Sequence, residues 1–197
     1  MKLTRMFSLL LLSTFSVGFG GWCLSTAKPG FVDDAVAMCS LQAVPSDVKD
    51  DLSQNFASWK IQEPNNLSDA ARERWNAEKP LACPGIAVGR FANASLSYAF
   101  LLVSQQQTGR DYRFIVFDRT ERKASFDVRV LANSGGGAHD AFIRRVQVSE
   151  FADQSSRSRF LVYGIEGILF VDASTNEYES DLYFWNGRSY EHSPIDY

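Results

Sequence analysis

The chain has 197 residues, of which 45% are hydrophobic and 13% aromatic, and its formal net charge is −3. These proportions exclude a disordered or fibrous protein and fit a folded domain with a sizeable core. A mildly acidic chain without a dense basic cluster is poorly suited to bind nucleic acid or anionic lipid, where neutralisation of phosphate supplies much of the affinity. We therefore expect a protein partner or a small ligand, and no nucleic acid.

The first 27 residues have the pattern of a secretory signal peptide. Lys2 and Arg5 give a positive start, and residues 6–19 are almost wholly apolar. Residues 25–27, Ser-Thr-Ala, then offer a small-x-small cleavage site. The apolar run is shorter than the roughly 20 residues that a membrane-spanning helix needs. We predict export to the periplasm or the secreted space, with no membrane span after cleavage.

Cleavage leaves residues 28–197, which we predict to form a single globular domain. Its first part, residues 28–84, has a helical and loop-rich pattern, and residues 85–197 have the pattern of strands. Of the cysteines only Cys39 and Cys83 then remain, in a compartment that permits oxidation. We predict that they form a disulfide worth roughly 4 kcal/mol in the chain-entropy treatment. Two buried free thiols are the alternative.

Cys23 offers a second interpretation of the N-terminal segment, because it could be a site of lipid attachment. The bulky Trp22 argues against this interpretation, since it stands where lipoprotein signals require a small residue. We therefore favour cleavage after Ala27 and keep lipidation at Cys23 as the alternative.

Two short helices are predicted in the first part of the domain, over residues 45–56 and 68–77. Acidic residues in the first turn of each favour helix formation because they oppose the positive end of the helix dipole. The inward-facing positions follow helical spacing; they are Val48, Leu52 and Phe56 in the first helix and Ala71 and Trp75 in the second.

Strands are predicted for most of the second part. Their expected ranges are 86–91, 96–103, 112–118, 125–131, 142–148, 160–165, 168–171, 182–185 and 188–191. The strands at 96–103 and 112–118 are apolar on both faces, so both faces should be covered. The last two flank Asn186-Gly187, which favours a two-residue type I′ turn. We predict an α+β fold with one antiparallel sheet of about six or seven strands and the N-terminal helices on one face; a β-sandwich is the alternative.

Motifs for metal, phosphate or nucleophilic chemistry are missing from the sequence. We therefore expect no metal site and no cofactor. The best candidate site is the loop at residues 133–140, where three glycines precede His139 and Asp140, with Arg144 and Arg145 shortly after. Glycine lets a backbone approach a ligand closely, and histidine exchanges a proton near neutral pH. The loop is either a binding or active site or a plain connection between strands.

Two segments resemble known exported proteins. Residues 89–102, which begin Gly-Arg-Phe and end in an apolar strand, resemble a single FG-GAP-like strand–loop–strand unit. The calcium-binding aspartates of that family are replaced here by Ala, Asn, Ala and Ser at positions 92–95, so the resemblance implies no metal site. Residues 183–190 resemble the closing hairpin of small exported bacterial proteins of unassigned role. The resemblance implies a bacterial envelope or secreted protein.

These observations favour an exported, non-catalytic binding protein of the cell envelope or secreted space. Its candidate binding residues are His139, Asp140, Arg144 and Arg145. The alternative is a small hydrolase in which His139 acts as the base. A third hypothesis is an envelope component of the structural or immunity type, which acts by occupying a protein partner.

Overall fold

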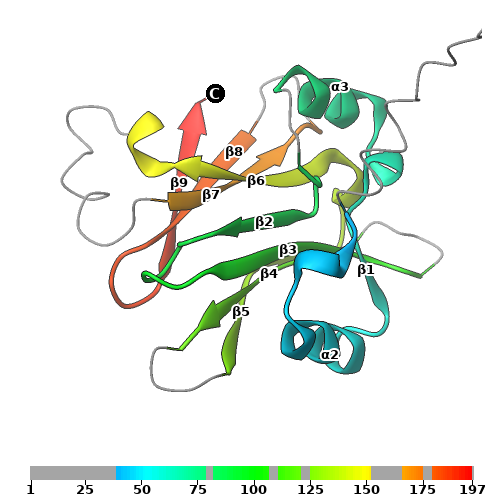
Figure 1. Ribbon diagram of the computed structural model, residues 1–197. Coiled ribbons are helices and arrows are strands. Elements are labelled where there is room, and N and C mark those ends of the chain that lie inside the picture. The colour runs from blue at the N-terminus through cyan, green and yellow to red at the C-terminus, as the bar shows by residue number, and fades with distance from the viewer. Residues whose placement is uncertain are drawn as a thin grey trace, which may run out of the picture.

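The structure is a computed structural model that describes residues 39–78, 82–106, 111–120, 125–151, 166–174 and 179–196. The predicted signal peptide, Cys23 and the predicted strand at 160–165 lie outside these residues. The described part contains two antiparallel sheets and two α-helices (Figure 1). The coarse prediction, mainly antiparallel sheet with helices from the first part of the domain, is therefore confirmed.

The first sheet has five strands in the order β1-β3-β4-β5, with β2 also paired to β3. Its strands are β1 (Trp59–Ile61), β2 (Ile86–Gly89), β3 (Ser97–Ser104), β4 (Tyr112–Arg119) and β5 (Phe126–Ser134). The second sheet has four strands in the order β6-β7-β8-β9. These are β6 (Ala141–Gln147), β7 (Glu166–Asp172), β8 (Glu179–Trp185) and β9 (Tyr190–Asp196).

The prediction of a single sheet is therefore wrong in its detail, since the strands divide between two. The chain leaves the first sheet after β5 and enters the second at β6 through a short 3-10 turn, η3 (Ala138–Asp140). Every strand pair in both sheets is antiparallel, and the sequence pattern of such strands does not reveal where one sheet ends. The very short β1 was not predicted.

The helices also differ from the prediction, because they do not share one sheet face. Helix α2 (Ser46–Asn55) packs on the outer side of the first sheet, and α3 (Asp69–Ala77) on the outer side of the second (Figure 1). The helix positions themselves match the prediction closely. Ser68 caps α3, since its hydroxyl oxygen accepts a hydrogen bond from the Ala71 amide at 3.3 Å.

Three apolar clusters result from this arrangement. The first outer cluster lies between α2 and the first sheet, and the second outer cluster between α3 and the second sheet. Between the two sheets lies the intersheet core, which includes Leu101, Phe114, Ile143 and Phe170. Every residue of β3 is buried, as the two apolar faces of this strand predicted. At one edge the sheets are joined directly, because the Ile143 amide donates to the Pro84 carbonyl at 2.8 Å.

The disulfide is present as predicted, with an S–S distance of 2.10 Å between Cys39 and Cys83. It joins the segment that precedes η1 (Leu41–Ala43) to the segment that precedes β2. Among the described residues, no helix combines the length and the apolarity needed to cross a membrane.

The terminal hairpin is confirmed, but its turn is longer than predicted. Trp185 pairs with Tyr190, which leaves the four residues 186–189 in the loop. The Asn186 side-chain oxygen accepts from the amides of Arg188 and Ser189, both at 2.8 Å. The Asn186 side chain therefore closes the turn, and Gly187 adopts a positive φ of 95° within it.

Candidate functional site: a polar groove beside His139

The glycine-rich loop ends in η3, which is held by hydrogen bonds from residues that are distant along the chain. Gln62, which is fully buried, donates through Nε2 to the carbonyls of Ala138 at 2.5 Å and Ala141 at 3.0 Å. The Ser68 amide donates to the His139 carbonyl at 2.7 Å. These bonds fix η3 against the segment that leads into α3, so His139 has a defined place.

The His139 ring is exposed, and its Nδ1 lies 2.7 Å from the carbonyl oxygen of Asn66. A carbonyl can only accept a hydrogen bond, so Nδ1 carries the hydrogen in this contact. A hydrolytic base would instead need a carboxylate to orient it and a nucleophile on its other side. Neither is hydrogen-bonded to His139 among the described residues.

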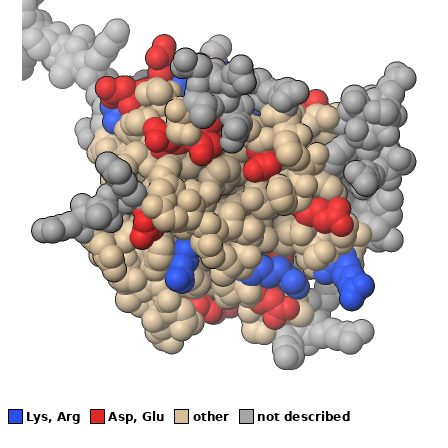
Figure 2. All heavy atoms as spheres, turned by 180° about the vertical axis from the view of Figure 1, so that it is seen from behind, with Lys and Arg blue, Asp and Glu red and all other residues tan. Residues whose placement is uncertain are grey.

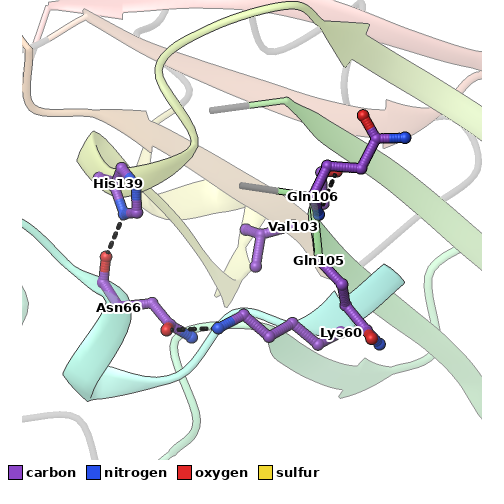
Figure 3. A pocket seen from close by; sticks show the side chains of 7 residues that line it. Lys60, Asn66, Val103, Gln105, Gln106 and His139 are labelled. Atoms are coloured by element: carbon purple, nitrogen blue, oxygen red, sulfur yellow. Dashed lines mark hydrogen bonds between the residues drawn. The ribbon is translucent and has the colours of Figure 1, made fainter. Parts of the chain in front are cut away.

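A groove of about 500 Å³ opens beside this ring. It is lined by Lys60, Asn66, Val103, Ser104, Gln105, Gln106 and His139. All but one of these side chains carry hydrogen-bonding groups, and Figure 3 shows them arranged around the opening. Lys60 reaches across it, with Nζ 2.8 Å from the Asn66 side-chain oxygen.

Asn66 is the residue that connects the parts of the groove. Its backbone carbonyl holds His139 and its side-chain oxygen holds Lys60. Its remaining polar group, Nδ2, is buried and has no hydrogen-bond partner in the described part of the structure. A buried donor without a partner is costly, by about 1–3 kcal/mol, so a ligand acceptor would stabilise Nδ2 if the side chain turned it toward the groove.

The other predicted site residues lie elsewhere or contribute only backbone groups. The Asp140 carbonyl accepts from the Ala173 amide at 2.9 Å, which ties η3 to the end of β7. Arg144 pairs with Glu78 of the α3 end at 2.6 Å, whereas Arg145 pairs with Glu166 of β7 at 3.7 Å. The two arginines thus have separate partners, and neither lines the groove. A binding role for these three residues stays a prediction.

Most of the groove was missed by the sequence analysis. Lys60 and Asn66 come from the segment before α3, and Ser104, Gln105 and Gln106 from the end of β3 and beyond. These residues are of types common on any surface and lie far apart along the chain. Only His139 had a local signal, its position after the three glycines.

A second polar cluster lies at one end of the intersheet core, around Asp118, which is 5% exposed. One carboxylate oxygen accepts from the hydroxyls of Ser97 at 2.7 Å and Tyr190 at 2.8 Å. The other lies 3.4 Å from Arg129 Nε, and the Arg129 guanidinium covers the Trp185 ring at 5.0 Å. Burial raises the pKa of Asp118, and these partners oppose the rise. We call these residues the Asp118 cluster; it joins both sheets.

The chain has a formal net charge of −3. Figure 2 shows the molecule from behind, with acidic side chains spread over the face and Lys and Arg side chains separated from one another by other residues. Among the described residues, no group of three or more His, Cys, Asp or Glu side chains is placed to hold a metal ion.

Comparisons with known protein families, with curated proteins and with solved structures give no match for this chain. The strand–loop–strand that carries the FG-GAP-like resemblance is formed by β2 and β3, which pair antiparallel. The resemblance, and the exported protein that it implies, stay predictions.

Proposed function

We propose that this chain is an exported, non-catalytic binding protein that holds its ligand or partner in the groove beside His139. The observation that carries the proposal is the buried, unpartnered Nδ2 of Asn66 at a groove lined almost wholly by hydrogen-bonding side chains. The Cys39–Cys83 disulfide supports export, because such bonds persist in oxidising compartments.

The chemistry of the lining favours a polar ligand that offers acceptors to Asn66 and Lys60. Lys60 Nζ makes one hydrogen bond, to Asn66, and an ammonium group has three donors. The groove side chains of Ser104, Gln105 and Gln106 add further donors and acceptors. A carboxylate, or a peptide segment with exposed carbonyl groups, would satisfy this lining.

The hydrolase alternative has less support in the described geometry. The donor position of His139 is taken by a backbone carbonyl, and the described residues that line the groove include no carboxylate. Ser104 is the hydroxyl-bearing residue of the lining, but its Oγ accepts from the Gln106 amide at 3.2 Å. The arrangement therefore holds these residues in place for contact with a ligand.

The test is native mass spectrometry of the oxidised protein, together with an affinity pull-down from envelope extract. Asn66→Ala is compared with Asn65→Ala, since Asn65 is the exposed neighbour outside the lining. We expect a retained molecule or stoichiometric partner that binds the wild type and Asn65→Ala equally and Asn66→Ala at least several-fold more weakly.

Two outcomes would contradict the proposal. One is a ligand or partner whose binding is unaffected by both Asn66→Ala and Lys60→Ala. The other is turnover of ester or amide substrates that His139→Ala abolishes and His192→Ala leaves unchanged, which would favour the hydrolase.

A further inference from the structure

Strand β5 forms one border of the first sheet, and no other described strand pairs with its outer edge (Figure 1). It is the longest of the described strands, with nine residues, and it contains neither proline nor lysine. The outer edge of a strand presents unpaired backbone N–H and C=O groups, which can pair with a strand of another chain. The outer edge of β5 is therefore a candidate interaction surface.

The other borders of the two sheets have features that oppose such pairing. β1 and β2, at the opposite border of the first sheet, have only three and four residues. The edge of β6 is partly occupied, because the Ile143 amide donates to the Pro84 carbonyl at 2.8 Å. β9 contains Pro194, which has no N–H to donate. A bulge can also protect an edge, but the register shift of β5 lies beyond Val130, so residues 126–130 pair regularly with β4.

The outer face of β5 is apolar and uncovered. Val128 and Val130 are 37% and 53% exposed, and they are two of the three large hydrophobic side chains that are exposed among the described residues. They pair with Phe117 and Ile115 of β4, which belong to the first outer cluster. An added strand with apolar side chains on this face would extend that cluster past β5.

The inner face of the same segment carries one residue of each charge. Asp127 lies opposite the buried Asp118 of β4, and like charges directly opposite each other in a sheet are unfavourable. Asp127 is exposed and makes no ion pair with any described residue. Arg129 follows two residues later, and its side chain is 40% exposed. A cation placed on the free side of Asp127 would offset the repulsion from Asp118.

We infer that β5 pairs with β5 of a second copy of this chain, antiparallel and centred on Val128. A two-fold axis at this residue places Asp127 of each copy opposite Arg129 of the other. On the outer face it places Val130 opposite Phe126 and the two Val128 side chains opposite each other, which are favourable apolar pairs. An axis centred on either neighbouring residue would place two aspartates or two arginines opposite each other. The charges therefore specify the register.

The proposed contact is one pair of strands, so we expect weak association, with a dissociation constant on the order of 100 µM. At the low micromolar concentrations of denaturation experiments the chain is then a monomer. No residue of β5 lines the groove beside His139, so the inference is independent of the proposed function.

The first test is sedimentation velocity of the oxidised protein from about 5 to about 500 µM, where we expect a monomer–dimer equilibrium. Asp127→Lys and Val130→Lys should each raise the dissociation constant roughly tenfold, because the two-fold axis introduces each change twice. Leu96→Lys is the matched control. It removes the third exposed large hydrophobic side chain and adds the same charge, but Leu96 lies outside β5, so the dissociation constant should be unchanged.

The second test measures the register by cysteine cross-linking. In a Cys23→Ser background, Val128→Cys and Val130→Cys each have a single cysteine outside the Cys39–Cys83 disulfide. Directly opposite residues have Cβ atoms about 4.5–5.5 Å apart, whereas the two copies of residue 130 would be about 14 Å apart. Mild oxidation should therefore form the covalent dimer at least roughly tenfold faster in Val128→Cys than in Val130→Cys.

Three results would overturn the inference. One is a wild-type protein that stays monomeric at the highest concentration, which would leave the β5 edge free for a strand of another protein. Another is a dimer that Val130→Lys weakens no more than Leu96→Lys does. The third is equally fast cross-linking of the two cysteine variants, which would exclude a register centred on Val128.

Discussion

Acidic side chains lie at both ends of the intersheet core, buried at one end and only partly buried at the other. At one end, Asp118 accepts two hydroxyl hydrogen bonds and faces Arg129, so its charge is matched by residues of both sheets. At the other end, Asp172 and Asp181 lie beside phenols, with His192 as the one described ion-pair partner. Asp118 thus has three polar or charged partners, whereas Asp172 and Asp181 are only partly buried and have fewer charged partners among the described residues.

This difference indicates that Asp118 contributes to stability, whereas Asp172 and Asp181 contribute less to it. A buried carboxylate is tolerated when it is hydrogen-bonded and paired, and its partners then depend on it. A carboxylate at the edge of an aromatic surface has fewer partners, so its removal should change the free energy of unfolding little. Substitution of single acids at each end therefore tests the comparison directly.

The largest effect is expected for Asp118→Ala. The substitution leaves the hydroxyls of Ser97 and Tyr190 without their acceptor and Arg129 without its carboxylate. We expect the free energy of unfolding to fall by about 3 kcal/mol. Urea denaturation at pH 7 measures it. Asp127→Ala is the control, because Asp127 lies opposite Asp118 on β5 but is exposed, and it should change stability by less than about 0.5 kcal/mol.

A loss in Asp118→Ala no larger than in the Asp127 control would show that the Asp118 cluster does not hold the sheets together. The two ends of the core would then be alike in energy, and the comparison would fail.

A smaller effect is expected for Gly137→Ala, at the loop beside Asp172. Gly137 has φ 79°, a left-handed conformation that costs a residue with a side chain about 1–2 kcal/mol. Gly136→Ala is the matched control, since a side-chain carbon there would meet nothing within 4 Å and its φ is not positive. Urea denaturation of both variants should show the loss at Gly137 alone. Equal losses of unfolding free energy in the two variants would mean that the left-handed conformation of Gly137 is not the cause.

Local periodicity was enough to predict most elements, because each helix and most strands carry their own pattern. The two-faced apolar runs at β3 and β4 correctly indicated strands covered on both sides. The division into two sheets was not predictable, since it depends on where the chain crosses between layers. On β5, Val128 and Val130 looked equivalent to Phe126, yet they are 37% and 53% exposed.

The exposure follows from the position of β5 at the edge of the first sheet, where Val128 and Val130 share one face with Phe126. The register shift between β4 and β5 lies beyond them, between Phe114 and Ile115. The candidate site was even harder to predict from the sequence. His139 was found from its local setting, but Asn66 and Lys60 matter because of contacts between segments that are distant along the chain.

The pH dependence of stability gives a second test of the Asp118 end, with a smaller expected effect. Burial raises the pKa of Asp118 above its ordinary value of 3.8, so the folded state holds this proton more tightly than the unfolded state. The resulting stability is fully present below the unfolded pKa and is lost as pH rises through the folded pKa. Wild type should therefore gain stability relative to Asp118→Asn as pH falls from 7 toward 4.

Urea denaturation of the two proteins at pH 7, 5.5 and 4.5 measures this gain as a difference, which cancels the titration of the other carboxylates. The asparagine side chain introduced by Asp118→Asn retains an oxygen that accepts from Ser97 or Tyr190, so the variant should fold. If the stability difference shrinks as pH falls, the pKa of Asp118 is lowered in the folded state. The hydrogen bonds and Arg129 would then affect this pKa more than burial does.

The smallest effect on stability is expected at the opposite end, for Asp172→Asn. The asparagine oxygen can still accept from the Ser174 amide, which now lies 2.9 Å from Asp172 Oδ1, so the unfolding free energy should change by less than about 0.5 kcal/mol. The charge effect should be visible instead at Tyr112, whose pKa is raised by burial and next by Asp172. Loss of that carboxylate lowers the pKa of Tyr112, because its phenolate no longer faces Asp172. Ultraviolet titration of the variant with and without Tyr112→Phe isolates this phenol. An unchanged Tyr112 titration, or a stability loss as large as that of Asp118→Ala, would show that Asp172 already has a matching cation.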